Sequence, residues 1–126
     1  MDPQAFLEKW HKGVAERDLG LLGELVAEDA KISSPAYWSP KGPKPYVMEI
    51  LRAVVEGTED FHYTKEWIDG NEMILEFGAR IDDTELRGID RVTLNDEGLI
   101  DHLEVMIRPI NALFKLAEFV KSEVAP

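Results

Sequence analysis

The stretch that decides the fold runs from Leu86 to Pro109 and reads LRGIDRVTLNDEGLIDHLEVMIRP. Successive side chains of a strand point to opposite faces, so this alternation predicts a β-hairpin with one inward face on each arm. The turn lies at 95–98 and ends in Gly98, a residue that closes such loops easily. The inward face of the first arm carries Gly88, Asp90, Val92 and Leu94, and that of the second arm carries Leu103, Val105 and Ile107.

Asp90 is the unexpected residue of this hairpin, because it occupies a position where the pattern predicts an apolar side chain. A carboxylate on the core side of a strand is costly to bury unless it is partnered or protonated. Two interpretations follow. Asp90 is either an acid with a catalytic or ligand-fixing role, or a structural carboxylate bonded to the backbone or to a neighbouring side chain.

The composition is that of an ordinary globular chain of 126 residues, 44% of them hydrophobic, and we expect a single domain over residues 1–126. There is no cysteine, which excludes disulfides and thiolate metal sites. Acidic residues outnumber basic ones 25 to 14, which argues against nucleic acid and anionic membranes as partners. Neither a secretory signal nor a membrane span is recognisable, so we expect a cytoplasmic location.

The remaining pattern predicts an α+β fold. Helical periodicity predicts helices at Pro3 to about Arg17, Leu19 to Ala27, Pro45 to about Glu56 and Ala112 to about Val124, the last capped by Asn111. Alternation predicts strands at Ala30 to Ser34, Phe61 to Asp69 and Met73 to Ile81, with Phe61, Tyr63, Lys65 and Trp67 on one face. We therefore expect a cone-shaped, mostly antiparallel sheet with three helices of the N-terminal half on its concave face and a C-terminal helix.

This order of elements resembles the nuclear transport factor 2-like superfamily. The motifs that carry the resemblance are Ala-Glu-Arg-Asp-Leu at 15–19, Glu-Asp-Ala at 28–30 and Asn-Asp-Glu-Gly-Leu-Ile at 95–100. Members include ketosteroid isomerases, scytalone dehydratase, limonene epoxide hydrolase and SnoaL-like polyketide cyclases. The resemblance covers nearly the whole chain to about Arg108 and implies the fold, whereas the function differs from member to member.

The ketosteroid isomerases allow a comparison residue by residue. They use an aspartate base after the second helix, a tyrosine in the first helix and a protonated aspartic acid in the penultimate strand. In this chain the resemblance places the strand acid at Asp90, the tyrosine at Trp10 and the base at Ser34. An indole lacks a phenol's acidity, and a serine is no base by itself, so steroid isomerisation by that mechanism is not expected. The epoxide hydrolase's Asp-Arg-Asp set has no clear counterpart.

The candidate site is an apolar pocket around Asp90. We expect aromatic side chains at its mouth and aliphatic ones on its floor, although such residues are also typical of a plain core. The candidate lining residues are Trp10, Ser34, Tyr37, Trp38, Tyr63, Phe77, Ala79, Val105 and Ile107. The three histidines follow no metal-ligand spacing, so neither a metal nor another cofactor is expected.

Three functional hypotheses follow. In the first, the chain is a cofactor-independent isomerase, cyclase or hydratase for a small hydrophobic metabolite, with Asp90 as proton donor or oxyanion partner. In the second, it binds a small molecule without changing it, and the distinction depends on whether a base lies within reach of Asp90. In the third, it is a structural dimer module with a filled core. We expect a homodimer through the outer sheet face, which carries Ile89, Thr93 and Met106, with the last helix acting as a lid or swapping to the partner.

Overall fold

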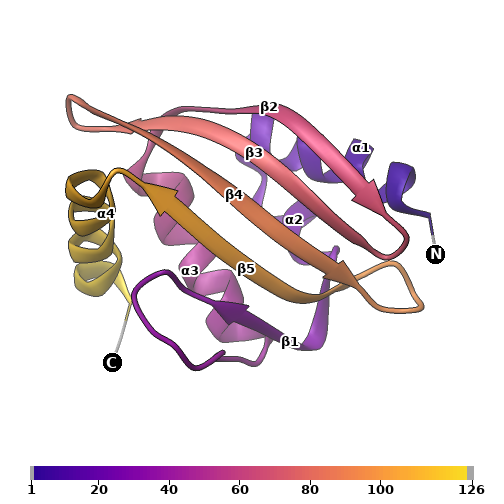
Figure 1. The fold of residues 1–126 in the computed structure, drawn as a ribbon. Coiled ribbons are helices and arrows are strands. Elements are labelled where there is room, and N and C mark those ends of the chain that lie inside the picture. The colour runs from indigo at the N-terminus through magenta and orange to yellow at the C-terminus, as the bar shows by residue number, and fades with distance from the viewer. Residues whose placement is uncertain (1, 125–126) are drawn as a thin grey trace.

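The computed structural model describes residues 2–124, and its elements follow the predicted order of helices and strands (Figure 1). The helices are α1 (Pro3–Ala15), α2 (Leu19–Gly23), α3 (Lys44–Gly57) and α4 (Ile110–Glu123). The strands are β1 (Val26–Ser33), β2 (Glu59–Asp69), β3 (Glu72–Ile81), β4 (Thr84–Leu94) and β5 (Ile100–Arg108). The prediction of an α+β fold with a closing C-terminal helix is confirmed.

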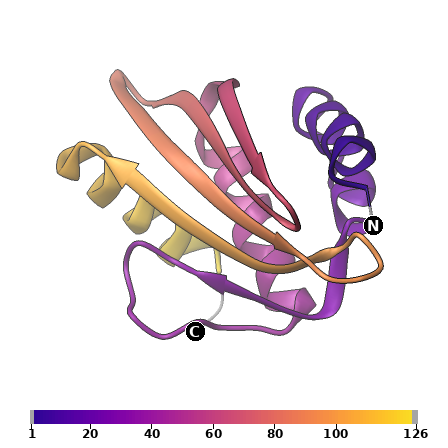
Figure 2. The same cartoon turned by 45° about the vertical axis from the view of Figure 1, so that its right-hand side comes forward.

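One curved, open sheet organises the molecule. Its strand order is β1-β5-β4-β3-β2, with β1 parallel to β5 and every other neighbouring pair antiparallel. Helix α3 lies behind the concave face, α1 and α2 lie toward one end, and α4 lies at the other end (Figures 1 and 2). Within the described residues, no helix combines the length and apolar character needed to cross a membrane.

The β4–β5 hairpin forms the middle of the sheet, as the sequence predicts. Every second residue of β4 is buried, namely Leu86, Gly88, Asp90, Val92 and Leu94. In the register of the sheet, Asp90 lies opposite Leu75 of β3 on one side and Val105 of β5 on the other. The carboxyl group therefore lies at the centre of the concave face, between apolar neighbours.

Two apolar clusters fill the concave side. The larger one joins α1 and α2 to the sheet through side chains such as Phe6, Trp10 and Leu22. The smaller one joins α4 to the sheet through Ala112 and Leu116. Helix α4 thus packs against one end of the sheet.

Two predicted helix boundaries are wrong. Helix α2 ends at Gly23 rather than at Ala27, because Val26 and Ala27 belong to β1, where Val26 lies opposite Ile100 of β5. Pairing with the sheet thus overrides a short apolar run that also suits a helix. Helix α4 begins at Ile110, so Asn111 lies inside it and does not cap it.

The predicted shared face of β2 is wrong in its second half. The register of β2 against β3 shifts between Tyr63 and Lys65. Such a bulge reverses the side-chain direction beyond it. Tyr63 lies opposite Phe77 on the concave face, whereas Trp67 lies opposite Ile74 on the outer face, with 46% of its surface exposed.

Candidate functional site

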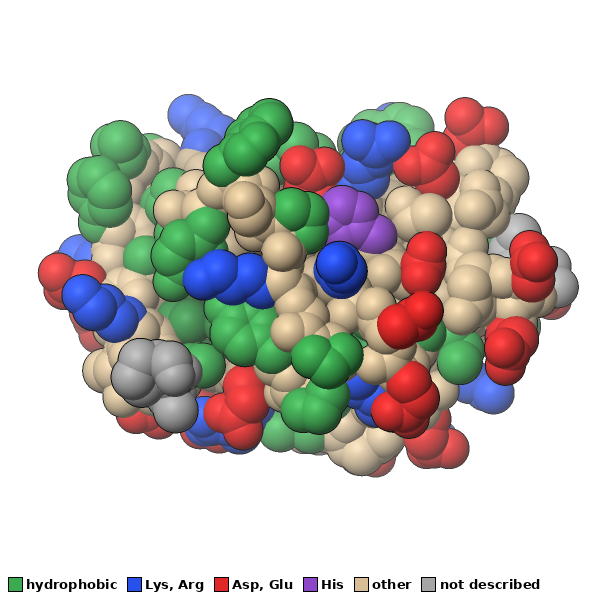
Figure 3. Space-filling view, turned by 90° about the horizontal axis from the view of Figure 1, so that it is seen from below, with side chains coloured by type: hydrophobic (Ala, Val, Ile, Leu, Met, Phe, Trp, Pro, Cys, Tyr) green, Lys and Arg blue, Asp and Glu red, His purple; other side chains and the backbone are tan. Residues whose placement is uncertain are grey.

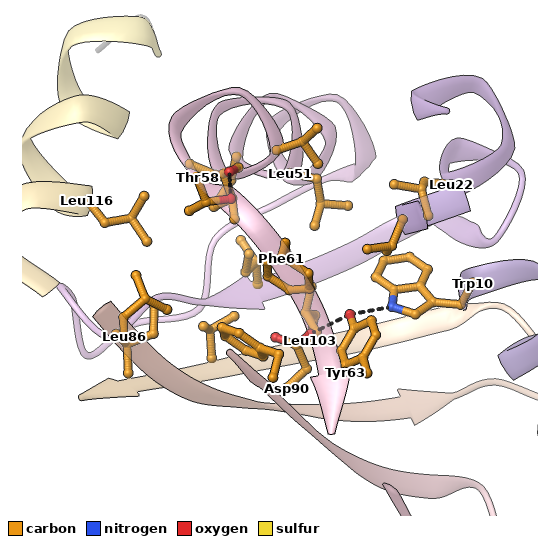
Figure 4. Close-up of a pocket in the computed structure, with 18 of the residues that line it drawn as sticks. Trp10, Leu22, Leu51, Thr58, Phe61, Tyr63, Leu86, Asp90, Leu103 and Leu116 are labelled. Carbon is orange, nitrogen blue, oxygen red and sulfur yellow. Dashed lines mark hydrogen bonds between the residues drawn. The ribbon is translucent and has the colours of Figure 1, made fainter. Parts of the chain in front are cut away.

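A hollow lies between the concave face of the sheet and helix α3 (Figure 4). Its volume is about 80 Å³, and we call it the inner chamber. Its floor comes from strands β2 to β5, its roof from α3, and its ends from α1 and α4. The polar groups of its lining belong to Trp10, Arg17, Thr58, Tyr63 and Asp90, and the other lining residues are aliphatic or aromatic.

Tyr63 connects Asp90 to the first helix by two hydrogen bonds (Figure 4). Trp10 Nε1 donates to the Tyr63 hydroxyl at 2.8 Å, and that hydroxyl donates to Asp90 Oδ2 at 3.1 Å. An indole N–H can only donate, so it fixes the direction of the chain and leaves the single phenol proton for Asp90. Asp90 Oδ1 has no hydrogen-bond partner among the described residues.

The surroundings of Asp90 favour its protonated form. The side chain is only 7% exposed, and burial raises the pKa of its carboxyl from 3.8 to about 7, although the Tyr63 hydrogen bond lowers it in part. Burial and the nearby Asp90 charge raise the pKa of Tyr63 well above 10, so the phenol stays neutral. Since Oδ2 accepts from Tyr63, the carboxyl proton belongs on Oδ1.

This arrangement gives the chamber one group that exchanges a proton near neutral pH. Protonated, Asp90 donates a hydrogen bond from Oδ1 to an oxygen atom of a ligand; ionised, it accepts a proton. No second carboxylate and no histidine lines the chamber within residues 2–124. Arg17 donates to the backbone oxygen of Val55, and Thr58 Oγ1 donates to the backbone oxygen of Val54 at 2.8 Å.

A second hollow, the outer groove, adjoins the inner chamber. It has a volume of about 340 Å³ and lies between α3, α4 and the loop that follows β1. Ser34 and Tyr37 line the loop side, and Phe114 and Ala117 line the helix side. Six aliphatic side chains line both hollows and form their common boundary: Ile32, Ile50, Val54, Val105, Ile107 and Leu116.

The structure places the predicted site residues in three groups. The inner chamber brings together Asp90, Trp10, Tyr63, Phe77, Val105 and Ile107. The outer groove takes Ser34 and Tyr37. Two residues lie outside both hollows. Trp38 is 96% exposed on its proline-rich loop, and Ala79 is buried in the cluster that packs against α4.

The comparison with ketosteroid isomerases needs one correction. The phenol next to Asp90 is present, but Tyr63 supplies it from β2 instead of a residue at the position of Trp10. Alternation indicates that Tyr63 points inward, whereas its reach across β3 to Asp90 cannot be read from the sequence. Ser34 does not line the inner chamber, and its Oγ accepts a hydrogen bond from the Ala36 N–H at 3.0 Å.

The histidines lie outside the inner chamber and are hydrogen-bonded elsewhere. His102 Nε2 lies 2.7 Å from Ser33 Oγ, His11 Nε2 lies 2.8 Å from Glu66 Oε2, and His62 Nδ1 lies 2.6 Å from the backbone oxygen of Asp60. Within the described part of the chain, no three side chains of His, Asp or Glu gather as metal ligands would.

The same architecture occurs in proteins of known structure. No family model and no curated protein matches the sequence. Among solved structures, a steroid delta-isomerase from Pseudomonas aeruginosa is 38% identical with a TM-score of 0.90, over 95% of this chain and 89% of that one. An uncharacterised protein with a cystatin-like fold from Silicibacter pomeroyi is 27% identical with a TM-score of 0.87, over 93% of this chain and 83% of that one.

A third structure, an NTF2-like protein of unknown function from Cytophaga hutchinsonii, shares the fold at 13% identity. Its TM-score is 0.69, and the match covers 88% of this chain and 94% of that one. The curved sheet with helices on its concave face is thus the cone of the NTF2-like fold. The chain belongs to the nuclear transport factor 2-like superfamily.

Proposed function

We propose that this chain binds a small apolar molecule carrying a carbonyl oxygen, and that Asp90 exchanges a proton with it without a cofactor. The reaction class is isomerisation, cyclisation or hydration. The observation that carries the proposal is the orientation of the Asp90 carboxyl. Tyr63 occupies Oδ2, and Oδ1 is left toward an apolar chamber.

The physical chemistry of such a chamber supports proton transfer. A group with a pKa near the working pH is both a competent donor and a competent acceptor. The pKa of Asp90, raised by burial to about 7, meets that condition. An apolar lining also strengthens a hydrogen bond to a carbonyl oxygen, because water does not compete for either partner.

The steroid delta-isomerase supports the reaction class, since at 38% identity it shares the fold over nearly the full chain. An isomerase of an unsaturated ketone takes a proton from carbon while the oxygen is stabilised, and then returns the proton to a different carbon. In this chamber protonated Asp90, with the Tyr63 phenol beside it, is the donor that stabilises the oxygen. No second carboxylate or histidine lines the chamber within the described residues, so the proton taken from carbon passes to a water molecule, which returns it to the other carbon.

The proposal is tested by isomerase assays with β,γ-unsaturated ketones, including a steroid ketone, followed by the ultraviolet absorbance of the conjugated product. We expect turnover by the native chain and at least 100-fold less by the Asp90→Asn variant, because general acid–base groups typically contribute that much. Tyr63→Phe keeps the Asp90 carboxyl, so its turnover is expected to fall by less than that of Asp90→Asn. Equal turnover by native chain and Asp90→Asn would remove the proposed role.

A second candidate function is binding without turnover. The observation that favours it is the lining of the inner chamber, which among the described residues contains a single carboxylate and no histidine. The two functions separate in heavy water. A catalyst exchanges the hydrogens next to the carbonyl of a bound ketone for deuterium, whereas a binding protein binds the same ketone and leaves them in place.

We also infer that two copies pair through the outer face of the sheet. Met106 lies there with 48% of its surface exposed, opposite Ile89 in the register of β4 and β5. Arg91 of the same face forms an ion pair of 2.9 Å with Glu72, so the apolar patch has a charged neighbour. An apolar centre with a polar rim is typical of interfaces between subunits.

A further inference from the structure

The inner chamber is too small for the kind of ligand that the proposed function requires. Its volume of about 80 Å³ is well below the roughly 300 Å³ or more of pockets that enclose a drug-sized ligand. The chamber therefore suits the carbonyl end of such a ligand and not the whole molecule. A larger ligand bound at Asp90 must therefore extend beyond the chamber.

The outer groove is the apolar direction in which such a ligand extends. The six shared side chains come from β1, α3, β5 and α4, and all of them are aliphatic. They form the boundary between the two hollows, and none of them is polar. On the far side of this boundary, the groove has about four times the volume of the chamber and is lined by side chains such as Leu113, Phe114 and Val120.

The other direction out of the chamber is polar. Val14, Phe61 and Tyr63 line the inner chamber and also a shallow depression between α1 and β2. The remaining lining there includes Lys65 and other polar groups. The 2.8 Å contact between His11 Nε2 and Glu66 Oε2 spans this gap and joins the two elements. An apolar tail of the ligand is therefore more stable in the outer groove beside α4 than in this polar depression.

We propose that the inner chamber and the outer groove form one site for an elongated ligand, with a carbonyl head at Asp90 and an aliphatic tail that leaves between α4 and the loop after β1. The proposal rests on the proposed function and adds the tail subsite. Apolar side chains gather on the half of the surface that carries α4 and this loop, whereas acidic side chains are frequent toward the opposite end (Figure 3). Phe114 is 61% exposed there, and Tyr37 is 51% exposed.

Two charged side chains restrict which kind of tail suits the outer groove. Glu118 and Lys121 line it with opposite charges, so their fields offset each other. A tail that ends in a charge gains little from such a pair. The site therefore fits an uncharged aliphatic chain, such as that of a long methyl ketone, better than a fatty acid of the same length.

The test is a series of methyl ketones from 2-butanone to 2-decanone, titrated against the native chain. Binding is followed by the NMR signal of the Trp10 indole N–H, which lies at the inner chamber. We expect affinity to rise about fourfold with each added methylene, because burying one such group contributes about 0.8 kcal/mol. Decanoate is expected to bind more weakly than 2-decanone.

The groove is then narrowed by Ala117→Phe, with Ala5→Phe as the matched control. Ala5 is exposed on α1 and lines none of the hollows described above. We expect Ala117→Phe to abolish the rise for the long ketones, and Ala5→Phe to preserve it. The thermal melting of both variants shows that they are folded.

Two results would overturn the tail subsite while leaving the proposed function intact. One is an affinity that stops rising after the shortest ketones. The other is a rise in affinity with chain length that Ala117→Phe does not change and Val14→Phe abolishes. That result would place the tail between α1 and β2. If no ketone binds the native chain at all, both the tail subsite and the proposed function fail.

Discussion

The Tyr63 hydroxyl donates a hydrogen bond to Asp90 Oδ2 at 3.1 Å, across the intervening strand β3. This contact joins the edge strand β2 to the central strand β4 and fixes which carboxyl oxygen faces the chamber. It also stabilises the ionised form of Asp90, against the effect of burial. The proton affinity of the site is thus a balance between these two effects.

Removing the phenol should shift that balance toward the protonated acid. In Tyr63→Phe the pKa of Asp90 is expected to rise further above 7, because the hydrogen bond that lowers it is lost and the burial remains. Ketone binding requires the protonated acid as donor, so affinity falls as pH rises past this pKa. Binding measured across pH 5 to 10 should show its midpoint at higher pH in Tyr63→Phe. An unchanged midpoint would contradict the account.

The raised pKa of Asp90 also predicts how stability depends on pH. The pKa is 3.8 in the unfolded chain and about 7 in the folded one, so the folded state retains a proton that the unfolded state has lost. The contribution of Asp90 is therefore complete below pH 4 and declines as pH rises to 7, by about 4 kcal/mol if burial acts in full. The asparagine in Asp90→Asn does not titrate, so this variant lacks that pH-dependent contribution.

Urea unfolding measures this difference. We expect the free energy of unfolding of Asp90→Asn, relative to the native chain, to increase between pH 4 and pH 8. Comparing the two chains removes the contribution of every other titrating group. A difference that stays constant over this range would mean that the Asp90 carboxyl titrates normally.

Gly88 is a packing position that a side chain cannot occupy. A Cβ atom there would meet the ring of Phe77 and lie 2.6 Å from the backbone oxygen of Met106. We expect Gly88→Ala to cost about 1–3 kcal/mol of unfolding free energy, because overpacking forces neighbouring atoms to move.

The control for this change is Gly20→Ala, at an exposed position of helix α2. The nearest atom to its new Cβ is Asp18 Oδ1 at 3.4 Å, an ordinary contact. Alanine favours a helix over glycine by about 1 kcal/mol, so this variant should equal or exceed the native stability. The free energy of unfolding of both variants is measured with a chemical denaturant. Equal values for the two variants would contradict the close packing at Gly88.

The proposed dimer is tested by a charge on its centre. Met106→Glu places a carboxylate on the exposed outer face of β5, where pairing would bury it. We expect a dimer for the native chain and a monomer for the variant in analytical ultracentrifugation. Ile110→Glu is the control, since Ile110 is 66% exposed and belongs to α4 instead of the sheet. A native monomer, or a variant dimer, would refute the interface.

The fold could be predicted from the sequence because its hairpin has a strict alternation, and residues such as Gly88 and Asp90 share the buried face as expected. The boundaries of α2 could not, since the partner of Val26 is Ile100, 74 positions away in the chain. Short apolar runs suit a helix and a strand alike, and only the assembled sheet decides between them.

The candidate site could be predicted only in part. Side chains alternate between the two faces of a strand, and this alternation alone predicts that Asp90 and Tyr63 point inward. The bulge after Tyr63, which turns Trp67 outward, has no signal in the sequence. The roof of the chamber comes from α3 residues such as Val54, and their height above the sheet depends on packing that no local pattern specifies.

The central claim is that Asp90 holds an exchangeable proton toward the chamber. The most direct measurement is the titration of its side-chain carboxyl carbon by NMR, with and without a bound ketone. The account predicts a pKa near 7 in the free chain, and a higher one when a carbonyl oxygen accepts the proton from Oδ1. A pKa near 4 that no ketone changes would contradict it.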